Sequence, residues 1–143
     1  MRGLFLAAAW GLSLALAGGA EAEGEEPAAP VGSACMWSGE FEFRGRPYRT
    51  RECLQMSPRM LQQVRAEFCQ GLAELPGKLG ARPVRAGKVE YLSQCPPPTL
   101  GTCYNAFDRP DMAIHYYERS APDVAGLPAE CSVLRGDWKP AQG

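Results

Sequence analysis

Apolar and polar residues alternate in the part of the chain that follows residue 35. Between residues 36 and 43 the aromatic side chains share one parity and the acidic side chains the other: Trp37, Phe41 and Phe43 against Glu40 and Glu42. A period of two is typical of a strand with one buried face. Arg44-Gly45-Arg46 is interpreted as a turn, and residues 47–54 as the returning strand. This stretch therefore predicts a β-hairpin.

A helix with clear start and stop signals is predicted next. Ser57 is a suitable N-cap, and Pro58 suits the first helical position because its missing N–H would have no partner there. Apolar residues then recur at helical spacing, with Cys69 beside them: Leu61, Val64, Phe68, Leu72 and Leu75. Pro76-Gly77 is expected to end the helix. Packing in a core is the preferred role for this apolar stripe.

The remaining elements are shorter. We expect a basic loop at 78–87, a strand at 88–94, a rigid connector at Cys95-Pro96-Pro97-Pro98, strands at 103–107 and 112–118 around a turn at 108–111, and a helix at 128–135 that carries Cys131. Trp138 is expected to close the domain. The order of elements predicts an α+β fold, a small disulfide-stapled domain with two β-hairpins that are each followed by a helix.

The two hairpins suggest an internal duplication. Cys35 and Tyr48 are separated by the same number of positions as Cys103 and Tyr116, and each hairpin precedes a helix with a cysteine. The hypothesis is a duplicated ββα unit. With only two units, coincidence between two cysteine-rich halves is an equal alternative.

The first residues read as a targeting segment. Arg2 precedes an apolar run too short for a membrane span, and Ala20-Glu21-Ala22 fits a signal-peptidase site. We therefore expect a signal peptide at 1–22, with cleavage after Ala20 as the variant and an N-terminal anchor as the alternative. An acidic, Pro/Ala-rich disordered tether is expected at 23–34, a disulfide-rich domain at 35–138 and a tail at 139–143. Cys35 has no lipobox before it, so export without a lipid anchor is expected, to the periplasm or outside the cell.

Six cysteines follow the signal segment, and the number is even: Cys35, Cys53, Cys69, Cys95, Cys103 and Cys131. No C-x-x-C occurs and there is one histidine, so disulfides are favoured over redox or metal roles. Six cysteines allow about 15 pairings. The predicted set is Cys35–Cys53 across the first hairpin, Cys103–Cys131 between a strand and a helix, and Cys69–Cys95 as the remainder.

The order of these residues resembles small exported bacterial proteins with six cysteines that have no assigned function. The matching positions are Cys53, Cys69, Cys95-Pro96, Gly101-Thr102-Cys103, Tyr116-Tyr117, Cys131 and Gly136-Asp137-Trp138. The resemblance spans most of the mature domain and departs from the pattern in the Arg/Lys-rich stretch between Cys69 and Cys95, and at Asp137. It implies an exported, disulfide-bonded protein and no known activity.

Charge is distributed unevenly along the chain. Ten basic residues and three acidic ones lie between Arg44 and Lys88, although the net charge of the whole chain is −1. Arginines crowd the first hairpin around one tyrosine, and we predict an anion-binding site there: Arg44, Arg46, Tyr48, Arg49 and Arg51. The alternative is a solvated face whose arginines pair with Glu40, Glu42 and Glu52.

Catalytic patterns are thin. His115 is the only histidine, and no nucleophile elbow, metalloprotease motif or phosphate loop occurs. The carboxylate pairs Glu40/Glu42 and Asp108/Asp111 are expected on a strand face and in a turn. We therefore expect no enzyme, cofactor or metal.

The expected function is that of a non-enzymatic binding or structural module of the cell envelope or extracellular space. Its partner would be an envelope or extracellular protein, an anionic glycan or a lipid headgroup, and not a nucleic acid. The alternative is an exported enzyme or enzyme inhibitor that acts through a disulfide-rigidified loop such as 95–103.

Overall fold

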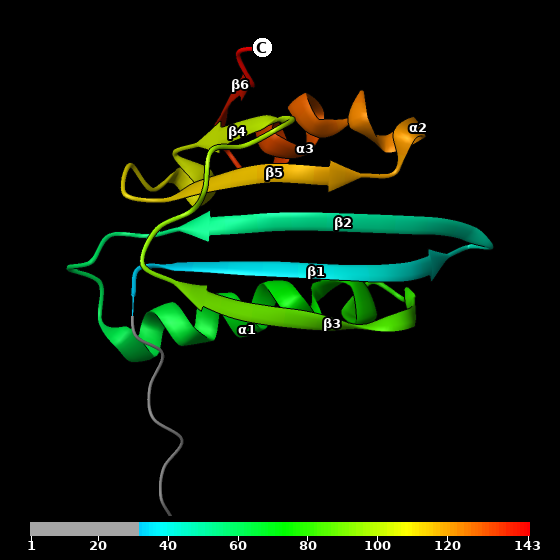
Figure 1. The fold of residues 1–143 in the computed structure, drawn as a ribbon, viewed down its shortest axis with the longest axis horizontal. Coiled ribbons are helices and arrows are strands. Elements are labelled where there is room, and N and C mark those ends of the chain that lie inside the picture. Colours follow the sequence, from blue (N-terminus) through cyan, green and yellow to red (C-terminus); the bar gives the residue numbers. More distant parts are fainter. Residues whose placement is uncertain (1–31) are drawn as a thin grey trace, which may run out of the picture.

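The fold is described by a computed structural model for residues 32–143, which form an antiparallel six-stranded sheet with helices on one face (Figure 1). The strands lie in the order β3-β1-β2-β5-β4-β6. The elements are β1 Ala34–Phe43, β2 Arg46–Gln55, α1 Gln62–Lys78, β3 Arg82–Leu92, β4 Gly101–Tyr104, the 3-10 helix η1 Ala106–Asp108, β5 Ala113–Arg119, α2 Ala121–Val124, α3 Leu127–Val133 and β6 Asp137–Pro140. The α+β class is confirmed. The predicted signal peptide and most of the tether lie outside the described residues.

The hairpin of β1 and β2 turns through two residues, one fewer than expected. Phe43 pairs with Arg46, and the loop residues Arg44 and Gly45 both have positive φ, 50° and 77°. Two positive φ values in a two-residue loop are typical of a type I′ turn, whose twist matches that of the strands. The turn fixes the register, so Cys35 lies opposite Leu54 and Met36 opposite Cys53. Neighbouring positions face opposite sides of the sheet.

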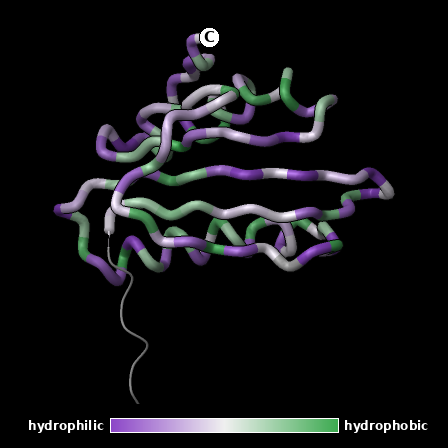
Figure 2. The backbone as a smooth tube through the Cα atoms, viewed as in Figure 1, coloured by the Kyte–Doolittle hydropathy of each residue, from purple (hydrophilic) through white to green (hydrophobic). Residues whose placement is uncertain are grey.

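The face of the sheet that carries α1 and α3, called here the helix-covered face, contains the larger core. A row of buried residues crosses its centre: Cys35, Leu54, Ile114 and Cys103. The opposite face has a smaller cluster of Ala34, Met36, Cys53 and Cys95. The connector from β3 to β4 crosses the sheet on that side (Figure 1). Apolar residues of β2 gather at its end near this cluster, and hydrophilic ones towards the hairpin (Figure 2).

The disulfide pairing differs from two of the three predicted pairs. The bonds join Cys35 to Cys69, Cys53 to Cys95, and Cys103 to Cys131. Cys103–Cys131 is confirmed, whereas Cys35–Cys53 and Cys69–Cys95 are wrong. The reason is the register of the hairpin, which points Cys35 to α1 on the helix-covered face and Cys53 to the connector on the other. Two of the bonds thus fasten a helix to the sheet.

Helix α1 begins later and ends later than its punctuation predicted. Residues 58–60 form a turn in which the hydroxyl of Ser57 accepts a hydrogen bond from the N–H of Arg59, and Leu61 takes the N-cap position. Pro76 lies inside the last turn. Its missing N–H removes one hydrogen bond from the helix, which ends two residues later. Gly80, with φ of 87°, follows the end.

Strand β3 replaces the predicted basic loop at 78–87. Pro83 and Gly87 disfavour a strand locally, yet both lie in an 11-residue strand. β3 is at the edge of the sheet, where a missing N–H can face solvent, and its pairing with β1 has register shifts near Glu40. The predicted strand at 88–94 forms the second half of β3.

The second half of the chain contains a strand that was not predicted. β6 pairs with β4 and extends beyond Trp138 into the expected tail. The predicted strand at 103–107 is shorter and continues into η1, and α2 precedes the predicted helix, here α3. Each half thus contains two paired strands, a disulfide-bonded helix and a third strand. The duplication hypothesis itself stays a prediction.

Candidate functional site

The helix-covered face changes from apolar to polar towards the β1–β2 hairpin. Beyond the apolar row, the next cross-strand neighbours on this face are Trp37, Glu52 and Tyr116. They are followed by the pair Thr50 and Arg119, and then, nearest the hairpin turn, by the pair Phe41 and Tyr48. Thr50, Glu52 and Tyr116 are buried, and the side chain of Arg119 is 3% exposed. Charged side chains are seldom fully buried unless paired, so this part of the face is a candidate functional site.

An irregularity in β5 places Arg119 in this site. The pairing of β2 with β5 shifts between Arg51 and Glu52, so Glu52 lies opposite Tyr116 and Arg51 opposite Glu118. Tyr117 is the extra residue. Regular alternation from Tyr116 would direct Glu118 to the helices and Arg119 to the other face; the bulge reverses this. Bulges commonly redirect a side chain in this way next to functional sites.

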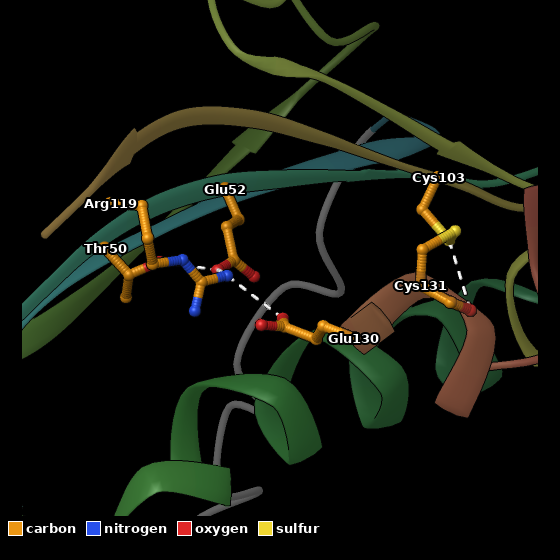
Figure 3. A network of polar contacts seen from close by, with 6 residues as sticks. All are labelled: Thr50, Glu52, Cys103, Arg119, Glu130 and Cys131. Atoms are coloured by element: carbon orange, nitrogen blue, oxygen red, sulfur yellow. Dashed lines mark hydrogen bonds and ion pairs between the residues drawn. A yellow bond between two sulfur atoms is a disulfide. The ribbon is translucent and has the colours of Figure 1, made fainter. Parts of the chain in front are cut away.

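Arg119 connects two carboxyl groups (Figure 3). Its Nη2 lies 2.5 Å from Oε1 of Glu52 in β2 and 3.0 Å from Oε1 of Glu130 in α3. The hydroxyl of Thr50 also donates to Oε1 of Glu52, at 2.5 Å. Arg119 therefore links the middle of the sheet to α3.

Burial disfavours the charged form of Glu52. Burial is the main cause of a pKa of about 8 for Glu52, and the charge of Glu130 acts in the same direction. The hydrogen bond that Thr50 donates acts to lower it. The side chain of Glu130 is 42% exposed and stays hydrated, whereas Glu52 is buried, so desolvation acts mainly on Glu52. Arg119 pairs with both carboxyl groups.

Several buried donors around this cluster are unsatisfied. Among the described residues, Nε1 of Trp37, the hydroxyl of Tyr116 and Nε of Arg119 have no hydrogen-bond partner of normal geometry. The guanidinium of Arg119 lies between two aromatic rings, 5.1 Å from the centroid of Tyr48 and 5.4 Å from that of Tyr116. Burial and the neighbouring carboxyl groups raise the pKa of Tyr116. Unsatisfied donors at this density are typical of functional sites.

A cavity of about 480 Å³ opens beside Arg119. It lies between the outer half of the β1–β2 hairpin and the start of α2, and we call it the arginine pocket. Its lining residues are Glu40, Phe41, Arg46, Pro47, Tyr48, Arg49, Val84, Arg119, Ser120, Ala121 and Pro122. Arg119 separates it from Glu52, which is not one of the lining residues.

The five residues predicted to bind anions do not form one surface. Arg46, Tyr48 and Arg49 line the arginine pocket, whereas Arg44 and Arg51 do not. Arg44 packs over the ring of Phe43, and Arg51 over that of Tyr117.

Several arginines of this region form ion pairs with acidic side chains. Arg46 pairs with Asp123 at 2.9 Å, and Glu40 receives both Arg49 at 2.9 Å and Arg85 at 3.7 Å. Glu42 pairs with Arg82. Exposed pairs of this kind contribute about 0–1 kcal/mol each, so a ligand could displace them at little cost.

The other chemical candidates lie elsewhere. His115 faces away from α1 and α3, with its Nδ1 3.1 Å from the hydroxyl of Thr102, and burial lowers its pKa. Glu40 and Glu42 lie on that same face, and Asp111 pairs with Arg109. Within residues 32–143, no group of three or more His, Cys, Asp or Glu side chains is arranged to hold a metal ion.

Sequence reasoning treated Glu52 as a counter-ion and missed Arg119. A signal for Glu52 was present, since it shares the parity of Tyr48, Thr50 and Leu54 and so faces the core. No such signal exists for Arg119, because a bulge cannot be read from alternation. No family model, curated protein or solved structure was found to match this chain.

Proposed function

We propose that the chain is an exported, non-enzymatic binding module, and that its ligand presents an anionic group to the arginine pocket. Three disulfides with no free cysteine in residues 32–143 support an oxidising compartment. Across those same residues, no helix has the length and apolar character needed to cross a bilayer. The periplasm or the extracellular space is thus the proposed location.

The charges around the pocket favour an anion. Three of the residues that line it are arginines and one is acidic: Arg46, Arg49 and Arg119 against Glu40. The other acidic partners of Arg46 and Arg119, which are Asp123, Glu52 and Glu130, do not line it. Guanidinium groups bind carboxylate, phosphate and sulfate through paired donors.

The observation that carries the proposal is the state of Arg119. It lines the pocket, its side chain is almost fully buried, its Nε has no partner among the described residues, and its ring neighbours hold it in place. A guanidinium held rigidly beside a cavity loses little freedom when it binds an anion.

The position of Glu52 favours binding over catalysis. A carboxyl with a pKa near 8 could serve as a proton donor, but Arg119 stands between Glu52 and the pocket. The alternative function, an exported enzyme or inhibitor, would use another part of the molecule. For an inhibitor this is the connector, which is held by Cys53–Cys95 and by the hydrogen bond from the Tyr117 hydroxyl to the carbonyl of Pro96. No disulfide joins Cys95 to Cys103, so the connector is not a disulfide-closed loop.

The test is binding of inorganic phosphate, sulfate and acetate to the oxidised protein, followed by NMR at constant ionic strength. We expect shifts in residues of the pocket, and at least tenfold weaker binding in Arg119→Gln, in line with about 1.5–3 kcal/mol for a charge-assisted hydrogen bond. Arg46→Gln, at an exposed site, should fold normally and weaken binding less. Arg59→Gln, an equal change of charge in the turn before α1, is the control.

Ionisation of Glu52 supplies a second readout. Above about pH 8 the carboxylate of Glu52 pairs with the charge of Arg119, so binding of sulfate, whose own charge is constant in this range, should weaken between pH 6 and 9. Glu52→Gln should remove that dependence. Equal binding by the wild type, Arg119→Gln and Arg59→Gln would contradict the proposed site. Shifts confined to the connector would favour the alternative.

A further inference from the structure

A second cavity lies beyond the arginine pocket, at the same end of the sheet. It has a volume of about 670 Å³ and lies between the last turns of α1 and the paired strands β1 and β3. Its lining residues are Phe41, Ala73, Glu74, Gly77, Lys78, Pro83 and Gly87. We call it the α1 cavity. Apart from Glu74 and Lys78, which pair with each other at 2.9 Å, its walls are apolar or small.

Phe41 is common to both cavities. On β3, Pro83 lines the α1 cavity and the adjacent Val84 lines the arginine pocket. The ring of Phe41 folds over Gly39, where a Cβ would lie 2.4 Å from it, and packs at 6.4 Å from Trp37 and 6.5 Å from Tyr48. An aromatic wall therefore leads from Arg119 towards α1.

Large apolar side chains are exposed around this end of the sheet. Leu75 is 43%, Leu79 65% and Val84 63% exposed. They come from the end of α1 and the start of β3, which lie together in Figure 1. Exposed apolar residues that gather beside a cavity are typical of a binding surface.

We propose that the ligand is an anionic amphiphile with a long alkyl chain, whose head is held by Arg119 and Arg46 and whose chain passes Phe41 into the α1 cavity. This inference rests on the proposed function and adds the class of ligand. The observation behind it is charge complementarity beside an adjoining cavity: arginines line the first cavity, mostly apolar and small residues line the second, and Phe41 lines both. Carboxylate, sulfate and phosphate heads all satisfy this chemistry.

The test measures affinity against chain length. Sodium hexanoate, octanoate, decanoate and dodecanoate are titrated below their critical micelle concentrations. Trp37 fluorescence in a Trp10→Phe/Trp138→Phe variant is the readout, and native mass spectrometry gives the stoichiometry. Each buried methylene should raise affinity about fourfold, until the α1 cavity is filled. Dodecyl sulfate and dodecyl phosphate distinguish the head groups, and dodecyltrimethylammonium tests the sign of charge.

Two glycines of α1 provide a matched pair of variants. A Cβ on Gly77 or on Gly71 would meet no atom within 4 Å beyond the helix's own neighbouring backbone, so both should accept a side chain. Gly77 lines the α1 cavity and Gly71 does not. We expect Gly77→Leu to weaken dodecanoate binding at least tenfold with phosphate binding unchanged, and Gly71→Leu to bind both as the wild type does.

The outcomes separate the two proposals. Equal affinity for hexanoate and dodecanoate, equal effects of the two leucine variants, or equal binding of the cationic amphiphile would overturn the inference. If phosphate still binds through Arg119 in that case, the proposed function stands. If neither phosphate nor any alkyl anion binds, both fail.

Discussion

The two halves of the sheet use the same cross-link and differ in how tightly they are packed. In the N-terminal half, β3-β1-β2 with α1, a disulfide joins Cys35 on the first strand to the helix; in the C-terminal half, β5-β4-β6 with α3, Cys103 is joined to its helix in the same way. The four cysteines of these two disulfides are buried. The bonds thus fix where each helix lies and leave the packing around it to other residues.

Glycines show that α1 is packed more loosely than the C-terminal half. Within the strands the two halves are alike, because a Cβ on Gly39 of β1 would lie 2.4 Å from the ring of Phe41. In the C-terminal half, a Cβ on Gly136 would lie 2.4 Å from Sγ of Cys103, and one on Gly101 2.5 Å from the ring of Trp138. In α1, Gly71 and Gly77 have open space, and Leu75 and Leu79 are exposed. Both cavities touch the N-terminal half. The loosely packed α1 therefore borders the α1 cavity, whereas the arginine pocket is shared, because Arg119 and the start of α2 come from the C-terminal half.

Removal of each helix-fastening disulfide is the largest expected perturbation. From sequence separations of 34 and 28 residues, loop entropy alone predicts losses of about 3.8 and about 3.6 kcal/mol for Cys35→Ala/Cys69→Ala and Cys103→Ala/Cys131→Ala. We expect the second variant to lose more, because its sulfurs are packed against Gly136. Urea unfolding at equal protein concentration measures both. A larger loss in the N-terminal half would contradict the comparison.

A methyl group added in each half is expected to act in opposite directions. Gly136→Ala should destabilise the protein by about 1–3 kcal/mol, because the Cβ collides with Cys103 and with the carbonyl of Tyr104. Gly71→Ala should stabilise it by about 0.5–1 kcal/mol, because glycine inside a helix is entropically unfavourable. Thermal unfolding of the two variants beside the wild type is the measurement. A shift in melting temperature of the same sign in both would show that the halves are packed alike.

The class of fold and most strands of the molecule were predictable from alternation, but the pairing of cysteines depended on one residue of the turn. A three-residue turn at 44–46 would have placed Cys35 and Cys53 on the same face. The two-residue loop shifts the register by one position and places them on opposite faces. Arg44 occupies a positive-φ position that sequence preference assigns to Asn, Asp or Gly, which is why the shorter loop was not expected.

The candidate site was half predictable. Arg46, Tyr48 and Arg49 were identified from charge and spacing, and they line the pocket. Arg119 was not, because the bulge at Tyr117 depends on the pairing of β2 with β5, which are more than 50 residues apart. The strand β3 was missed for a related reason: Pro83 and Gly87 disfavour a strand locally, and only an edge position makes them acceptable.

Glu52 lies where the two halves meet, and it should make stability depend on pH. Its pKa is about 8 in the folded protein against 4.5 when exposed, so the folded state holds a proton that the unfolded chain releases. The stabilisation is complete below about 4.5 and is lost as pH rises towards 8, by about 1.4 kcal/mol per pH unit within that window. Urea unfolding between pH 5 and 8.5 measures it. Glu52→Gln should flatten the profile; an unchanged slope in that variant would show that another group carries it.

His115 should give a weaker dependence of the opposite sign. Burial against Thr102 on the other face lowers its pKa, so the unfolded chain binds a proton more readily than the folded protein. Stability from this residue is present above about 6.5 and is lost as pH falls below that value. The pH windows of Glu52 and His115 overlap below about 6.5, so the effect of His115 on stability is measured in the Glu52→Gln variant. In that background, His115→Gln should abolish a small loss of stability between pH 7 and 5. A loss that persists in the double variant would assign the slope to carboxylates in exposed ion pairs, such as Glu74 with Lys78.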